Sequence, residues 1–173
     1  MNNKALIDFI SNYIKTNNIK FIFDLGCGDF SFFKNFNFNN LKYFGVDSDE
    51  IIIDKNNSNY RTPNIKFFHG NITNFVIDKP CDLIIIKDVF ANLCNDEVFQ
   101  ILFNFRNYSK ILIINDYIEN NIDISNGQYR GINLNLWPFY AYAECLYELQ
   151  NNNTIKKCML VDGKKMFPES VLN

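Results

Sequence analysis

The sequence has no paired cysteines. Its five cysteines are isolated from one another, no two form a C-x-x-C pair, and their number is odd: Cys27, Cys81, Cys94, Cys145 and Cys158. Structural zinc sites and the disulfide frameworks of small secreted domains depend on such pairs or on an even count. We therefore expect neither kind of site, and the cysteine pattern indicates a reduced, cytoplasmic protein.

The sequence also lacks a surplus of charge and a long apolar run. Its 17 Lys and Arg residues face 19 Asp and Glu residues, and the net charge of −2 gives no general attraction for nucleic acid. No segment reaches the length of a membrane span, and MNNKALIDFISNYIK at the N-terminus lacks the pattern of a signal peptide. The lysine pairs Lys156-Lys157 and Lys164-Lys165 are interpreted as parts of a solvated face. We expect neither nucleic acid nor a membrane as a partner.

Strand-like and helix-like segments alternate along the chain, and 173 residues are predicted to form one domain spanning residues 1–173. Apolar residues at helical spacing from Ala5 to Ile14 predict an N-terminal helix. Two strand segments, IFDL and LIII, are continuously apolar, as expected when both faces of a sheet are covered. Strands are predicted at residues 20–25, 41–46, 65–69, 82–86 and 110–114, and helices at 30–37, 49–55 and 96–106. The expected fold class is α/β: a Rossmann-like, doubly wound, mostly parallel sheet of order 3-2-1-4-5 plus C-terminal strands, with helices on both faces.

Residues 117–137, which we call the insertion segment, interrupt this alternation because they carry no clear helix pattern. A segment of that length in a compact domain indicates an insertion or a lid over the acceptor site. Every other residue from Ile132 to Leu136 is apolar, which predicts a short, half-buried strand. Pro138 suits the first turn of a helix through residue 150, and residues 154–161 predict a last strand before an Asp162-Gly163 turn.

The stretch DLGCGDF, residues 24–30, follows the first predicted strand and is called the glycine turn below. In an open parallel sheet, ligands bind outside the carboxyl ends of the strands. Dinucleotide enzymes use G-x-G-x-x-G, but the third position here is Ser31, and Asp24 would set a negative charge near a phosphate. A ligand that carries an ammonium and a sulfonium group suits this acid instead. Asp47 ends the second strand roughly twenty residues later, where a carboxylate can accept both ribose hydroxyls.

Several motifs in order give the sequence a family resemblance. DLGCGDF, GVDSD (residues 45–49) and FHGNIT (residues 68–73) resemble motifs of the class I S-adenosylmethionine-dependent methyltransferases, and the resemblance covers essentially the full chain. The sequence is similar to a small group of them that reads D-x-G-C-G-D-[WF], K-D-V, N-D and G-x-Y-R-x-x-x-L. Two positions depart from the pattern: Asn71 stands where Asp is usual, and Ala91-Asn92 stands where a His often follows K-D-V. The first bears on the adenine contacts and the second on any catalysis by histidine.

The resemblance implies S-adenosyl-L-methionine as the cofactor and S-adenosyl-L-homocysteine as its product. The acid and glycines of the glycine turn would hold the methionine part, and the acid ending the second strand would hold the ribose. The turn after the third strand would hold the adenine, and the lysine ending the fourth strand would lie beside the sulfonium. The implied cofactor-binding residues are Asp24, Gly26, Cys27, Gly28, Phe30, Asp47, Ser48, Asn71, Ile72 and Lys87.

Methyl transfer to a hydroxyl needs a group that takes the hydroxyl proton, as a carboxylate can. With the strand order 3-2-1-4-5, Asp88 and Asp116 follow neighbouring strands and share one rim of the sheet. We take Asp116 as the first candidate base and Asp88 as the second, although either could instead cap a helix or a loop. A metal-assisted route stays open because Asp88, Asn115 and Asp116 offer oxygen ligands, but the spacing specifies no metal site. His69, the only histidine, ends the third strand and is interpreted as a turn residue.

The candidate acceptor-binding residues follow the fourth and fifth strands or lie in the insertion segment: Asn92, Asn115, Tyr117, Tyr129, Arg130, Asn133 and Trp137. They favour O-methylation of a small polar acceptor such as a sugar, a nucleotide sugar or a glycan. Methylation of amino groups is disfavoured because KDVF stands where an N/D-P-P-Y/F/W sequence is usual. One large family of RNA ribose methyltransferases uses a Lys-Asp-Lys-Glu tetrad with a lysine ending the fifth strand, which here ends in Asn115-Asp116. An RNA or cap methyltransferase, or an inactive cofactor-binding partner subunit, is the alternative.

Overall fold

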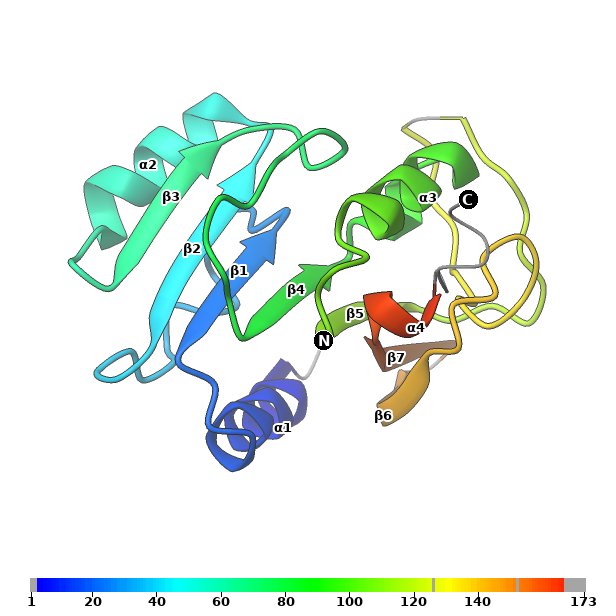
Figure 1. Ribbon diagram of the computed structural model, residues 1–173, viewed down its shortest axis with the longest axis horizontal. Helices are drawn as coiled ribbons and strands as arrows, with labels where there is room; N and C mark the ends of the chain where they lie inside the picture. Colours follow the sequence, from blue (N-terminus) through cyan, green and yellow to red (C-terminus); the bar gives the residue numbers. More distant parts are fainter. Residues whose placement is uncertain (1–2, 126, 152, 167–173) are drawn as a thin grey trace. The chain divides into compact units, whose positions relative to one another are not determined.

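The computed structural model describes residues 3–125, 127–151 and 153–166, and their strands form a seven-stranded sheet in the order β3-β2-β1-β4-β5-β7-β6 (Figure 1). β1 (Phe21–Leu25) pairs in parallel with β2 (Lys42–Asp47) and with β4 (Leu83–Lys87). β2 pairs in parallel with β3 (Ile65–His69). The predicted α/β class and the strand order 3-2-1-4-5 with added C-terminal strands are confirmed.

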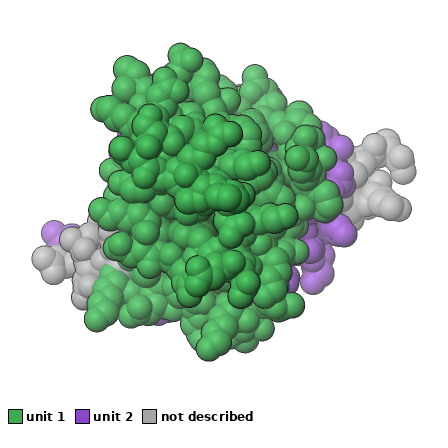
Figure 2. Space-filling model, turned by 90° about the vertical axis from the view of Figure 1, so that its left-hand side faces the viewer, with its two compact units in different colours: residues 1–85 green, residues 86–173 purple. Residues whose placement is uncertain are grey.

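The chain divides into two compact units, residues 1–85 and 86–173, which Figure 2 shows in different colours. The helices of unit 1 are α1 (Asn3–Thr16) and α2 (Glu50–Tyr60). In unit 2, β7 (Thr154–Val161) pairs antiparallel with β5 (Ile111–Asp116) and with β6 (Glu144–Asn151). The helical elements among the described residues of unit 2 are η1 (Phe90–Asn92), α3 (Asn95–Asn104) and α4 (Gly163–Met166).

Aromatic rings make up much of the core of unit 1. The Phe30 ring, whose residue is 2% exposed, lies with its centroid 5.0 Å from that of Tyr43, 5.0 Å from Phe67 and 5.2 Å from Tyr60. These partners come from β2, β3 and the last turn of α2, so one ring at the end of the glycine turn contacts three elements. Such ring pairs stabilise a fold beyond the burial of their area. The glycine turn is therefore fixed by packing at its carboxyl end.

The helix predicted at residues 30–37 is wrong, because this stretch forms successive turns. Gly28 (φ 53°) and Phe30 (φ 61°) both take the left-handed backbone conformation, which a right-handed helix excludes. Phe33 is also buried, and its ring centroid lies 5.3 Å from that of Tyr43. Burial of the aromatic side chains therefore outweighs the helical pattern. The helices predicted near the N-terminus and at residues 49–55 and 96–106 form as α1, α2 and α3. α2 is capped by Asp49, whose carboxylate accepts from the Ile52 backbone N–H at 3.1 Å.

The helix predicted from Pro138 through residue 150 is also wrong, because residues 144–151 form strand β6. β6 and β7 pair as a hairpin from Glu144 opposite Leu160 to Asn151 opposite Thr154. Just before β6, Tyr140 (φ 44°) and Tyr142 (φ 49°) are left-handed, which stops a helix from continuing. The Asp162-Gly163 turn predicted after the last strand is instead the start of the short helix α4.

The insertion segment contains no helix and no strand among its described residues, 117–125 and 127–137, and the short strand predicted near Ile132 is absent. Side chains hold the segment at both ends. Asn121 donates to the carbonyls of Asn133 and Trp137 at 2.8 Å each and accepts from the Asn133 backbone N–H at 2.8 Å. At Gly131 an added Cβ would lie 2.9 Å from the Tyr117 carbonyl carbon and oxygen, so glycine permits the close approach of two backbone stretches.

Arg130 anchors the middle of the insertion segment. It is 3% exposed, and its guanidinium donates to the Asn95 side chain at 2.7 Å, to the Leu93 carbonyl at 3.0 Å and to the Ile122 carbonyl. Desolvation lowers the pKa of this guanidinium, while Asp123 acts in the opposite direction. Through these hydrogen bonds Arg130 holds the insertion segment against η1 and α3.

No helix in the described part of the chain is long and apolar enough to cross a membrane.

Candidate functional site

The glycine turn of unit 1 is fastened to the carboxyl end of β2. The Val46 carbonyl accepts hydrogen bonds from the backbone N–H groups of Gly26 at 2.8 Å and Cys27 at 3.0 Å. The Gly28 N–H donates to Asp47 Oδ2 at 2.9 Å, and Asp47 Oδ1 accepts from the Asp49 N–H at 3.0 Å. A carboxylate has about four lone-pair positions, so Asp47 retains the capacity to accept two further donors. The half-buried Asp47 is thus oriented by the turn it follows in the sequence.

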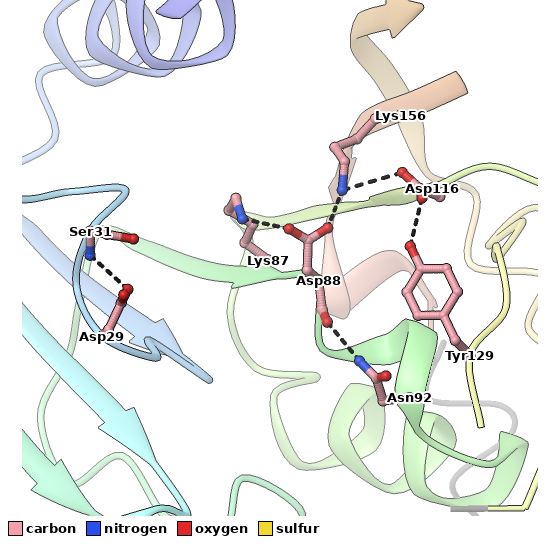
Figure 3. A network of polar contacts seen from close by, with 8 residues as sticks. All are labelled: Asp29, Ser31, Lys87, Asp88, Asn92, Asp116, Tyr129 and Lys156. Carbon is pink, nitrogen blue, oxygen red and sulfur yellow. Dashed lines mark hydrogen bonds and ion pairs between the residues drawn. The ribbon is translucent and has the colours of Figure 1, made fainter. Parts of the chain in front are cut away.

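Three carboxylates surround the glycine turn. Asp24 is 2% exposed and accepts a hydrogen bond from the hydroxyl of Tyr43, which is fully buried. Asp29 is exposed, and its carboxylate accepts from the Ser31 backbone N–H at 3.0 Å (Figure 3). Hydrogen bonds from Ser31 lower the pKa of Asp29. Together with Asp47 these groups create a negative potential, which attracts a cationic ligand and repels a phosphate.

The thiol of Cys27 lies in the negative potential of these three carboxylates. Burial raises the pKa of its thiol, and the charges of Asp24, Asp47 and Asp29 raise it further. The thiol is therefore neutral and unreactive. Its Sγ would lie 2.8 Å from a Cβ added at Gly45, so Cys27 fills the space beneath β2. This placement fits a spacer within the turn.

The other residues expected at the cofactor site of unit 1 differ in exposure. The Phe30 side chain lies in the aromatic core, so only its backbone is available to a ligand. Ser48 is exposed, and its carbonyl lies 3.2 Å from the ring nitrogen Nε2 of His69. Asn71 is exposed, and its Oδ1 caps a turn by accepting from the Thr73 backbone N–H and hydroxyl at 3.0 and 2.9 Å, while Ile72 is buried. The Asn71 side chain therefore shapes the turn after β3.

Unit 2 gathers two lysines and two carboxylates, which we call the lysine–carboxylate cluster: Lys87, Asp88, Asp116 and Lys156 (Figure 3). Asp88 Oδ2 lies 2.5 Å from Lys87 Nζ, and Asp88 Oδ1 is paired with Lys156 Nζ. Lys156 Nζ also lies 3.3 Å from Asp116 Oδ1. The Tyr129 hydroxyl donates to Asp116 Oδ2 at 2.6 Å. The two carboxylates predicted to share one rim are therefore joined by one ammonium group.

The two carboxylates of this cluster have different environments. Both oxygens of Asp88 face a lysine; burial raises its pKa, but the hydrogen bonds and charges of Lys156 and Lys87 outweigh burial and hold the pKa below its usual range. Asp88 also takes a left-handed backbone (φ 58°), and its carbonyl accepts from the Asn92 side chain at 3.0 Å. Asp116 meets a neutral phenol on one oxygen, because desolvation and Asp116 itself raise the pKa of Tyr129. The other oxygen of Asp116 lies 3.3 Å from Lys156, so Asp116 faces one lysine where Asp88 faces two.

Lys156 contradicts the interpretation of the Lys156-Lys157 pair as a solvated face. Lys156 is 4% exposed and lies within the cluster. Consecutive residues of a strand point to opposite faces, and Lys157 accordingly lies on the other side of β7, 3.4 Å from Glu148 and above the Tyr117 ring. The two lysines therefore have separate environments.

Some of the expected acceptor residues lie on the face of the sheet that carries Lys156, and others lie on the face that carries Lys157. Tyr129 contacts Asp116, whereas Asn115, Tyr117 and Asn133 line a cavity together with Lys157 on the opposite face of β5. The cavity measures about 10 Å³, which is room for one water molecule and not for a sugar. Asn115 is 3% exposed, and neither atom of its amide has a hydrogen-bond partner among the described residues. Because Asn115 points away from Asp88 and Asp116, these three residues do not converge as a set of metal ligands.

Comparison with models of protein families and with curated proteins gives no match. Solved structures match over most of the chain. TehB from Haemophilus influenzae aligns with 90% of this chain and 61% of its own, with a TM-score of 0.66 and 18% identity. This chain thus spans less than two thirds of TehB. An S-adenosylmethionine-dependent methyltransferase from Clostridium acetobutylicum aligns over 94% of this chain and 92% of its own, with a TM-score of 0.66 and 14% identity.

A third match is magnesium protoporphyrin IX methyltransferase from Synechocystis, solved with bound S-adenosylmethionine; it covers 91% of this chain and 78% of its own at a TM-score of 0.64 and 10% identity. The chain shares the Rossmann-like fold of these methyltransferases. In this fold the glycine turn follows β1 and Asp47 ends β2, as the sequence motifs predicted. One fold serves many acceptors, so the acceptor depends on the residues of the site.

The sequence interpretation did not identify three residues that contact the glycine turn or the lysine–carboxylate cluster. Tyr43 holds Asp24, Lys156 joins Asp88 to Asp116, and Asn56 of α2, which is 2% exposed, donates to the Gly28 carbonyl at 2.7 Å. No sequence signal identifies Asn56, because asparagine occurs throughout the chain.

Proposed function

We propose that the protein is an S-adenosyl-L-methionine-dependent methyltransferase that methylates a hydroxyl of a small polar acceptor. The observation that carries the proposal is the glycine turn with its three carboxylates, of which Asp47 is hydrogen-bonded to Gly28 at 2.9 Å. A phosphate ligand is disfavoured there, whereas an ammonium and a sulfonium gain from the negative charge. The methyltransferase fold supports this choice of ligand.

In this proposal the residues of unit 1 hold the cofactor. Asp47 accepts the ribose hydroxyls, the backbone of Gly26 and Gly28 approaches the methionine part, and Asp24 attracts its ammonium. Asn71 and Ile72 border the adenine. The bound cofactor supplies an electrophilic methyl group and leaves as S-adenosyl-L-homocysteine. Lys87, which the motif resemblance also assigns to the cofactor, pairs within unit 2 with Asp88.

The lysine–carboxylate cluster provides the acid–base chemistry. Asp116 takes the proton of the acceptor hydroxyl, since a carboxylate that faces one lysine and a neutral phenol is a better base than one between two lysines. Tyr129, 57% exposed, and Trp137, 66% exposed, offer aromatic faces to an acceptor. A sugar or nucleotide-linked sugar presents both hydroxyls and apolar ring faces, and suits these groups.

A second candidate function is methylation of a ribose hydroxyl in RNA. The lysine absent from the end of the fifth strand is matched by Lys156, which reaches Asp88 and Asp116 from β7. Two lysines and two carboxylates therefore meet in one cluster, which weakens the sequence-based argument against RNA. The net charge of −2 favours the small acceptor. RNA as acceptor would make activity fall steeply with added salt.

The proposal is tested by transfer of labelled methyl from S-adenosylmethionine to two pools: nucleotide sugars with free glycans, and capped RNA. Asp47→Asn protein serves as the control, at a cofactor concentration that saturates the wild-type protein and not the variant. We expect label in the sugar pool with the wild-type protein only. Label in RNA alone selects the second candidate, and binding of cofactor without label in either pool favours a cofactor-binding partner subunit.

Tyr43→Phe tests the role of the Asp24 carboxylate. The change removes one hydroxyl donor, so cofactor affinity is expected to fall by roughly 2- to 10-fold, the worth of one hydrogen bond. A donor favours the ionised carboxylate; without it Asp24 binds a proton more readily, and the loss of affinity should grow as the pH falls. Isothermal titration with S-adenosylmethionine across the acid range measures both effects.

Tyr60→Phe is the matched control for Tyr43→Phe. The Tyr60 ring packs on Phe30 at nearly the same distance as the Tyr43 ring, 5.2 against 5.0 Å, but its variant leaves the hydrogen bond to Asp24 in place. Asp29 and Asp47 are the other acids near the turn and are unchanged in both variants. Equal affinity and equal pH dependence in the two variants would show that Tyr43 serves only the core.

A further inference from the structure

Lys156 is a charged side chain held almost entirely out of water. It comes from β7, opposite Asp116 in the strand register, and its ammonium contacts Asp88 and Asp116. An ammonium removed from water is retained only where opposite charges or hydrogen bonds compensate for its lost hydration. Here the compensation comes from the two candidate bases themselves.

The charges of the cluster balance only when Lys156 is counted. Lys87 and Lys156 carry two positive charges, and Asp88 and Asp116 carry two negative ones. Two carboxylates that face one ammonium lie close enough to repel each other, and without the ammonium one of them would hold a proton at higher pH. Tyr129 of the insertion segment is a further titratable group in contact with the cluster, through Asp116.

We propose that Lys156 is a positioning residue that keeps Asp88 and Asp116 ionised together and so keeps Asp116 available as the proton acceptor. The inference rests on the proposed function. In the reaction the acceptor oxygen gains the methyl carbon as the carbon–sulfur bond breaks, with that electron pair left on sulfur. The acceptor proton passes to Asp116 and then to solvent. Lys156 takes no part in bond making; its pairing with Asp88 lets it accommodate a neutral Asp116 during turnover.

The test is a titration of the aspartate carboxyls by carbon-13 NMR in wild-type and Lys156→Met protein, without cofactor or acceptor. The Asp88 and Asp116 signals are assigned with the single Asn variants. We expect one of the two carboxyls to titrate at least about one pH unit higher in Lys156→Met, the shift that loss of a close opposite charge produces. In an active enzyme the acid limb of kcat/KM should move upward by the same amount, while cofactor affinity stays unchanged.

A second variant, in which the charges balance again, should reverse the titration shift expected in Lys156→Met. Asp88→Asn combined with Lys156→Met leaves one lysine and one carboxylate, so Asp116 should titrate within a few tenths of a unit of its wild-type position. Lys157→Met, which removes the neighbouring lysine on the other face of β7, should leave both carboxyls unchanged. An unchanged titration in Lys156→Met, or a double variant that keeps the shift, would overturn the proposal.

Folding of the variants is part of the same test. Lys156→Met leaves two carboxylates with one lysine, so the single variant is expected to be the less stable and the double variant to regain thermal stability. If the single variant does not fold and the double variant does, charge balance is supported; if neither folds, Lys156 has a packing role and the proposal fails. Because the NMR titration needs no turnover, its result stands even if no acceptor pool is labelled.

Discussion

Replacing Asp116 by asparagine is expected to lower kcat by roughly 100-fold or more, the usual contribution of a general base, and to leave cofactor affinity unchanged. The amide has nearly the shape of the carboxylate and can still accept the Tyr129 hydrogen bond, so the insertion segment keeps its contact with β5. What is lost is the lone pair that takes the acceptor proton. Steady-state kinetics with the labelled acceptor pool and separate calorimetric binding of the cofactor measure the two effects.

Asp88→Asn is the matched control for Asp116→Asn. Both residues belong to the lysine–carboxylate cluster, but both Asp88 oxygens are already occupied by lysines. Its loss should therefore reduce kcat much less than the loss of Asp116, through the changed charge balance around Asp116. A larger effect at Asp88 would exchange the two roles and make the carboxylate with the lowered pKa the working base.

The positions of the parallel strands and of the glycine turn could be predicted from the sequence because they depend on local signals, and the order of these strands followed from their alternation with helices. A continuously apolar run such as IFDL predicts a buried strand, and glycines that follow such a run predict a turn. Asp47 and Asp116 were placed correctly at strand ends for the same reason. The helix predicted at residues 30–37 failed because its aromatic residues pack on β2 and β3, which a pattern along the chain does not reveal.

The set of residues that gather around Asp88 and Asp116 depends on contacts between residues far apart in the sequence. Lys156 and Asp88 are 68 residues apart, and they meet because β7 pairs antiparallel with β5, which places Lys156 opposite Asp116. The last strand was predicted from the sequence, but its neighbour in the sheet was not, and Lys156 was therefore interpreted as a surface lysine. Asn115 and Asp116 were grouped because they are adjacent, yet adjacency in a strand places side chains on opposite faces. Arg130 was expected to orient the acceptor, but its side chain is buried and donates hydrogen bonds to Asn95 and to the Leu93 carbonyl.

Asp47→Asn should weaken S-adenosylmethionine binding by roughly 10- to 100-fold, the range expected when hydrogen bonds to a charged group are lost. The carboxylate is already oriented by the Gly28 and Asp49 backbone N–H groups, so no reorganisation is needed before it accepts the ribose hydroxyls. An amide offers one oxygen in place of two and no charge, and its NH₂ group faces backbone donors unfavourably. Calorimetric titration with S-adenosylmethionine and with S-adenosylhomocysteine measures the loss.

The pair of titrations separates two contributions of Asp47. Loss of the ribose contact weakens both ligands equally, whereas loss of negative charge weakens the sulfonium form more, because only that form carries the positive sulfur. Asp49→Asn is the matched control: Asp49 lies two residues away and caps α2, a position where asparagine serves as well as aspartate. Cofactor binding that survives Asp47→Asn but fails in Asp49→Asn would remove the glycine turn and β2 from the cofactor site, and with them the argument for a sulfonium ligand.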